Sequence, residues 1–212
     1  MATKAKKKRQ PYLRLYVKPS QMDFEAIHWY ENANRMFLTA FGPDADFFIG
    51  LLAATSPRLQ VRANLRKALQ VYKAWKRHQR ELSDESAREL SDVLGGLMYA
   101  HLINVVRVLQ GKPLHGPKVK RFAENLKGNL SPVTIDMWIC KAYGLPHAKL
   151  TELQYTRLEK KIQNEAIKAG LKPAQYQALI WYSARRKGGY VTDQSFVKHY
   201  ETLFPEFGLE VR

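Results

Sequence analysis

The stretch from Leu114 to Tyr143 constrains the fold most, because it predicts a tight turn and then two helices joined by a short loop. Gly116 permits a sharp turn, and Pro117 suits the first position of a helix, where no backbone N–H is needed. Apolar residues then recur at helical spacing, at Val119, Phe122, Ala123 and Leu126. After a Ser-Pro break, Asp136 is expected to cap the second helix.

The remainder of the chain shows the same pattern of capped, amphipathic segments. Predicted helices cover about residues 20–41, 45–55, 59–78, 84–94, 97–109, 151–169, 173–186 and 192–203. Their expected N-caps are Ser20, Asp44, Ser83 and Thr151, the last with Gln154 in a capping box. The segment FFIGLLAA is apolar on every side, so it is expected to be the buried central helix.

This pattern predicts an all-α fold of about ten helices. We expect one helical domain over residues 20–205, a basic and flexible arm over residues 1–19, and a C-terminal tail over residues 206–212. No apolar run approaches the length that spans a membrane, and the basic N-terminus lacks the apolar segment of a secretory signal. We therefore expect no membrane association.

The charge of the chain indicates a polyanionic partner. Thirty-five Lys and Arg against nineteen Asp and Glu give a formal net charge of +16, which favours nucleic acid. Two alternatives stay open, namely a charge that serves solubility alone and an anionic membrane surface. The second lacks a basic amphipathic helix with exposed aromatic residues.

Cysteine and histidine usage exclude several kinds of site. Cys140 is the single cysteine, so neither a disulfide nor a four-cysteine iron–sulfur cluster is expected. The six histidines are not spaced as metal ligands. We therefore expect no metal and no cofactor, and a reducing, cytoplasmic compartment.

Two motifs resemble the helix–hairpin–helix DNA glycosylases, the endonuclease-III-like superfamily. In the first, Gly116-Pro117-Lys118 is followed by Asn125 seven residues after the lysine and by Asp136 eighteen residues after it. The second runs from Leu51 through Pro57 and is similar to the buried helix and turn that the family places beside a flipped base. The resemblance covers about residues 47–186, and it implies a compact helix–hairpin–helix bundle without an iron–sulfur cluster. The chain departs from the family at Leu114, where the hairpin usually begins with glycine, and at Thr55, where glutamine is usual.

The resemblance also implies an activity, namely DNA N-glycosylase action on a flipped base, with a possible lyase step. Asp136 would stabilise the sugar cation and Lys118 would attack C1′ as a neutral amine. The implied DNA contacts are Gly116, Lys120, Arg121, Thr55, Ser56, Arg58 and Arg62. Candidate pocket residues are Trp138, Tyr143 and Trp181, with Trp29, Tyr30 and Tyr182 as further aromatic candidates.

Each of these residues also has a possible role that is structural or non-catalytic. Lys118 can be a phosphate contact, Asp136 can be a structural cap, and the aromatic residues can belong to the core. Two other functions also stay open. One is an enzyme of the same fold that modifies a flipped base, as in phage thymine hypermodification, and the other is a non-catalytic DNA-binding module. The expected partner is double-stranded DNA, bound by a monomer associated with the nucleoid of a bacterial or phage-infected cell.

Overall fold

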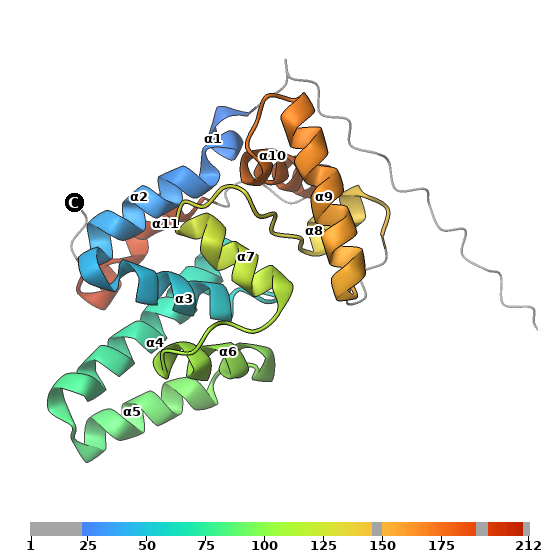
Figure 1. The fold of residues 1–212 in the computed structure, drawn as a ribbon. Helices are drawn as coiled ribbons and strands as arrows, with labels where there is room; N and C mark the ends of the chain where they lie inside the picture. Colours follow the sequence, from blue (N-terminus) through green and yellow to red (C-terminus); the bar gives the residue numbers. More distant parts are fainter. Residues whose placement is uncertain (1–22, 146–149, 190–194, 210–212) are drawn as a thin grey trace, which may run out of the picture.

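The computed structural model describes residues 23–145, 150–189 and 195–209, and these residues contain helices, turns and loops but no strand (Figure 1). The predicted all-α fold is therefore confirmed. The predicted arm over residues 1–19 and the predicted cap Ser20 lie outside the described residues. The α-helices are α1 (Phe24–Ile27), α2 (Trp29–Phe41), α3 (Ala45–Thr55), α4 (Val61–Glu81), α5 (Asp84–Gly95), α6 (Tyr99–Leu109), α7 (Pro117–Leu126), α8 (Met137–Ala142), α9 (Glu152–Lys168), α10 (Pro173–Lys187) and α11 (Phe196–Leu203). Two 3-10 helices are η2 (Gly42–Asp44) and η3 (Pro205–Phe207).

The helices enclose two hydrophobic cores. The first and larger core takes residues from α1 to α4, α6, α7, α10 and α11, and the second takes residues 133–135, α8, α9 and α10. Figure 1 shows α8, α9 and α10 gathered on one side of the molecule, with α4, α5 and α6 at the opposite end. Because α10 supplies side chains to both cores, it joins the two parts.

Helix α3 is the central helix that its sequence predicts. Phe48, Ile49, Leu51 and Leu52 are fully buried, and α3 packs against α2, α4, α6 and α7. A Cβ atom at Gly50 would lie 3.2 Å from Cγ1 of Val108, so the glycine allows α6 to approach closely. The stretch Trp29–Thr55 is apolar enough to span a membrane by composition, but η2 interrupts it and 56% of its most apolar window is buried. Buried core helices show the same composition.

Local sequence signals fix most helix ends. Pro117 is the first residue of α7, and Gly116 before it has a φ of 94°, which favours glycine. Capping boxes start α5 at Ser83 and α9 at Thr151. The apolar face predicted for α7 is buried as expected.

Three boundary predictions are corrected. The helix predicted over residues 20–41 divides at His28, because Asp23 caps the short α1 and α2 starts afresh at Trp29. Asp44 precedes α3 without capping it, since its carboxylate instead accepts a hydrogen bond from the Tyr72 hydroxyl. The described part of the predicted tail packs on the fold, where Phe207 and Leu209 contact the first core.

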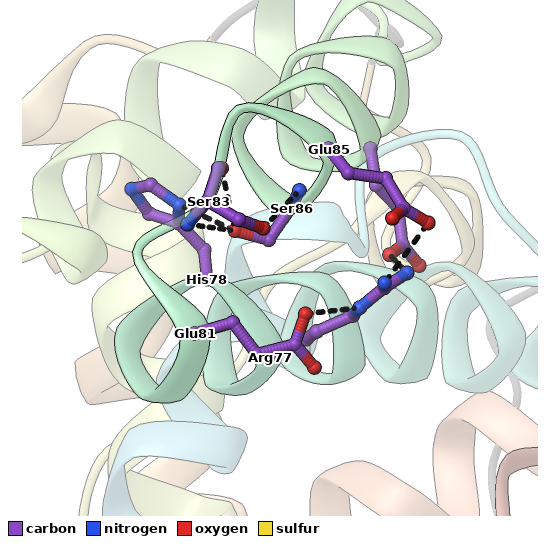
Figure 2. Close-up of polar contacts among 7 residues, drawn as sticks. Arg77, His78, Glu81, Ser83, Glu85 and Ser86 are labelled. Carbon is purple, nitrogen blue, oxygen red and sulfur yellow. Dashed lines mark hydrogen bonds and ion pairs between the residues drawn. The ribbon is translucent and has the colours of Figure 1, made fainter.

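Arg77 organises the connection between α4 and α5. Its guanidinium contacts three carboxylates, those of Glu81 at 2.9 Å, Glu85 at 3.0 Å and Glu89 at 2.8 Å (Figure 2). Beside it, Nδ1 of His78 lies 3.2 Å from the hydroxyl of Ser86. These carboxylates engage the Arg77 guanidinium, whereas the described residues offer no ion-pair partner to Arg62 near the N-terminal end of α4.

One glycine is required by packing alone, and it gives a stability prediction. Gly188 has a φ of −77°, which any residue adopts, but a Cβ atom there would lie 2.8 Å from the buried ring of Trp138. We expect Gly188→Ala to lower the free energy of unfolding by about 1–3 kcal/mol, as overpacking does. Urea denaturation measures it. Gly95→Ala is the matched control, because a Cβ atom there meets nothing within 4 Å and the helix should gain stability. Equal behaviour of the two variants would contradict the packing explanation.

Candidate functional site

A cavity of about 90 Å³ lies at the boundary between the two cores, where several helix ends meet. The turn between α3 and α4, the first turn of α7, the N-terminus of α8 and the middle of α10 all reach it. Its apolar wall is aromatic and consists of Trp29, Tyr30, Phe122, Trp181 and Phe196. Its polar lining consists of Ser56, Asn64, Lys118, Thr134, Asp136 and Gln177. The cavity has the size of a few water molecules or one flat ring, since a water occupies about 30 Å³ in the liquid.

Lys118 reaches this cavity from the first turn of α7. Its Nζ donates a hydrogen bond of 2.7 Å to the hydroxyl of Ser56 and lies 5.3 Å from the centre of the Phe122 ring. Burial lowers the pKa of the Lys118 amine to about 8, and the charge of Asp136 opposes this lowering. At pH 7 about a tenth of such an amine is neutral, and the neutral form is the nucleophile.

Asp136 is held at the start of α8 by three donors. Its Oδ1 accepts hydrogen bonds from the backbone N–H groups of Trp138 at 2.8 Å and Ile139 at 2.9 Å. Its Oδ2 accepts one of 2.9 Å from Nε1 of Trp181. These donors orient the half-buried carboxylate at the edge of the cavity. The prediction that Asp136 caps this helix is confirmed, and the carboxylate lines the same cavity as Lys118.

Ser56 orients the lysine. Its hydroxyl donates a hydrogen bond of 2.8 Å to the carbonyl of Ala53, so its oxygen is left to accept the bond from Lys118. One N–H of the amine is thereby fixed, which limits the directions that its lone pair can take. Ser56 is buried, so its predicted role as a direct DNA contact is corrected to this positioning role.

Two other predicted DNA contacts are corrected. Thr55 is fully buried, and its hydroxyl lies 2.7 Å from Oδ1 of Asn64 within the fold, so it does not reach a duplex. Arg121 is engaged by the carboxylate of Glu159 at 2.7 Å and by the face of the Tyr155 ring. Thr55 is thus part of the interior, and the half-buried Arg121 is held in an ion pair within the fold.

Three of the four remaining predicted contacts stay available to a ligand. Arg58, Arg62 and Lys120 are exposed, and the described part of the chain offers none of them a hydrogen-bond or ion-pair partner. Arg58 has a φ of 63°, an unfavourable value for a residue with a side chain. The carbonyl of the preceding Pro57 lies 2.8 Å from Nε2 of the buried His101, which holds this turn in place.

Of the three pocket residues predicted first, one lines the cavity. Trp181 does, but Trp138 is buried in the second core and Tyr143 hydrogen-bonds to Glu165 away from the cavity. The structure therefore places these two rings outside the cavity, where they pack α8 against its neighbours. Two of the further aromatic candidates, Trp29 and Tyr30, do line the cavity.

Several cavity residues escaped the sequence prediction. Gln177 and Asn64 are buried polar residues on α10 and α4, and Phe122 and Phe196 were assigned to helix packing alone. A buried amide in an apolar helical stretch is the signal that could have revealed Gln177. Within the described residues, no group of three His, Cys, Asp or Glu side chains could hold a metal ion.

Comparison with known proteins assigns a family but no activity. Neither a search of curated proteins nor a search of solved structures gave a match. The sequence model of one family matches residues 5–188, which is most of the chain. The chain therefore belongs to DUF7178, a family of unknown function.

Proposed function

We propose that the protein is a DNA N-glycosylase of helix–hairpin–helix type that acts on a flipped base and has a lyase step. The observation that carries this proposal is that Lys118 and Asp136 line one aromatic cavity. They come from different helices, α7 and α8, so the fold is needed to bring them together. A base cannot be reached inside a duplex, and an aromatic cavity of this size suits a single base taken out of the stack.

The chemistry follows from the two side chains. As the bond between C1′ and the base breaks, the base leaves with the bonding electrons and takes up a proton. The carboxylate of Asp136 stabilises the positive charge that develops on the sugar. The neutral Lys118 amine forms a new bond to C1′ and loses a proton, and opening of the sugar ring then gives an imine.

The connection between α6 and α7 supports the hairpin part of the proposal. Asn104 of α6 clamps the backbone of His115, accepting from its N–H at 2.6 Å and donating to its carbonyl at 3.1 Å. Gly111 and Gly116 both have positive φ angles in this loop. The clamp fixes the approach to α7, whose N-terminal end carries Lys118 and attracts anions.

The exposed cations give a prediction for DNA binding. Arg58 and Arg62 flank cavity residues on the turn and first residues of α4. We expect the slope of log K against log salt concentration to be several units steep, with about 0.9 lost for each phosphate contact removed. Arg58→Gln and Arg62→Gln should each reduce the slope by about that amount. Binding that does not change with salt would contradict a DNA partner.

Arg77→Gln is the matched control for these two variants. Like Arg62→Gln, it removes one arginine from α4, but the guanidinium of Arg77 is already engaged by three carboxylates. The salt slope should therefore stay at the wild-type value. A reduction equal to that of Arg62→Gln would show that total charge, and not phosphate contact near the cavity, governs binding.

The activity itself is tested by base release. Duplexes that each carry one modified or mispaired base are incubated with the protein, and the free base is measured by mass spectrometry. Release from at least one duplex, accompanied by a strand break from the lyase step, is the expected result. Salt-dependent binding to all duplexes without any release would favour a non-catalytic DNA-binding module instead.

A further inference from the structure

The cavity has a charged mouth and a buried polar floor. Lys118 and Asp136 are half-buried at the mouth. Tyr30 and Gln177, which are only 2% and 3% exposed, form the floor. In the proposed reaction the sugar must meet Lys118 and Asp136. The pairing edge of a nucleobase lies away from its bond to the sugar, so this edge would point to the floor.

The amide of Gln177 has a defined orientation. The Tyr30 hydroxyl donates a hydrogen bond of 2.8 Å to Oε1 of Gln177, which occupies the oxygen end of the amide. Burial raises the pKa of the Tyr30 hydroxyl above its usual range, so it keeps its proton and acts as a donor. The nitrogen end, Nε2, carries two N–H groups, and no hydrogen bond from either is found among the described residues. The floor therefore presents hydrogen-bond donors to a ligand.

We propose that Gln177 is a specificity-determining residue, which selects a base whose pairing edge carries a carbonyl oxygen where adenine and cytosine carry an amino group. This inference rests on the proposed function and names its substrate class. A carbonyl oxygen accepts the N–H of Gln177. An amino group in the same place would put its N–H next to the N–H of Gln177. Neither donor would then have an acceptor, and leaving a buried donor unsatisfied costs binding free energy.

The experiment measures binding under conditions in which cleavage is blocked. Four duplexes each carry one 2′-fluoro nucleotide opposite a tetrahydrofuran abasic analogue, so no base pair has to be broken and no imine can form at the abasic position. The fluorine destabilises the sugar cation, and the bond to the base stays intact. The bases form two pairs that differ in a carbonyl or an amino group, uracil with cytosine and hypoxanthine with adenine. Fluorescence anisotropy gives each affinity.

The wild-type protein should bind the carbonyl member of each pair at least about tenfold more tightly. Tyr30→Phe removes the hydroxyl that fixes the amide, so the amide can turn either end to the ligand. The ratio within each pair should then fall towards one while binding persists. Gln177→Met, which fills similar space without donors, should also lose the preference. A merely structural defect would weaken all four duplexes alike.

The outcomes separate this inference from the proposed function. Equal affinity within both pairs, or a preference for the amino bases, would overturn the role of Gln177. The glycosylase proposal would then still be decided by the separate base-release experiment. No binding to any of the four duplexes would overturn both. Retention of the full wild-type preference in both variants would likewise show that another group reads the base.

Discussion

Asp136→Asn is expected to give a folded protein that binds DNA but releases base about 10²–10³-fold more slowly than wild type. The change removes the charge that faces the sugar cation in the proposed reaction. The amide oxygen of asparagine can keep the two backbone hydrogen bonds that start α8. DNA affinity should stay the same or rise slightly, because one negative charge near the phosphates is lost. Base release under single-turnover conditions measures the effect.

The stability of this variant is set by Trp181. Capping alone predicts a neutral substitution, but Oδ2 of Asp136 accepts from the indole N–H. The amide nitrogen of asparagine would place a second donor there, at a cost of about 1 kcal/mol. In a Trp181→Phe background the indole donor is absent, so this stability cost should shrink while the activity loss persists.

Asp44→Asn is a control outside the cavity, because Asp44 also precedes a helix but pairs with Lys76. It should release base at the wild-type rate. Full base release by Asp136→Asn would show that Asp136 is a cap and no more.

Lys118→Gln is expected to abolish the covalent adduct that borohydride traps between the protein and a substrate duplex. The adduct requires an imine, which forms only on a neutral amine. Lys120→Gln is the matched control, since Lys120 lies two residues further along α7 and is exposed. It should weaken DNA binding but keep the adduct. Adduct formation by Lys118→Gln at the wild-type rate would move the nucleophile to another amine.

The pH dependence of trapping adds an independent readout. The pKa of Lys118 is lowered to about 8, so the trapping rate should rise with pH up to about 8 and then level off. The carboxylate of Asp136 opposes the lowering. Asp136→Asn should therefore lower the pKa further and move the midpoint of the profile to lower pH. A midpoint that stays near the ordinary lysine pKa would contradict the buried, nucleophilic amine.

Sequence patterns predicted the parts of the fold that depend on neighbouring residues. The caps at Ser83, Asp136 and Thr151 and the start of α7 at Pro117 are local signals, and the structure has them where they were expected. The burial of α3 followed from an apolar surface that leaves no polar face. The resemblance to the helix–hairpin–helix glycosylases implied that Lys118 and Asp136 belong together, and both line the cavity.

Predictions that depended on distant partners were the ones that failed. The side chain of Asp44 does not cap α3, because its carboxylate accepts a hydrogen bond from Tyr72 and forms an ion pair with Lys76. Both partners lie on α4. The sequence alone predicted that Arg121 is a surface cation, but it forms an ion pair with Glu159 of α9. Gln177 drew no attention, because its importance rests on a hydrogen bond to Tyr30, far away in the sequence. None of these partners is encoded by spacing along a single helix.

The position of α10 between the two cores determines how the protein unfolds. Ala178, Leu179 and Tyr182 belong to the first core, whereas Ile180 and Ala184 belong to the second. Detaching the second core would uncover one face of α10, and removing α10 would open the first core. Loss of either core thus destabilises the other, and thermal unfolding is expected as a single cooperative transition. For the same reason, cutting the chain between α7 and α8 should not yield two fragments that fold independently.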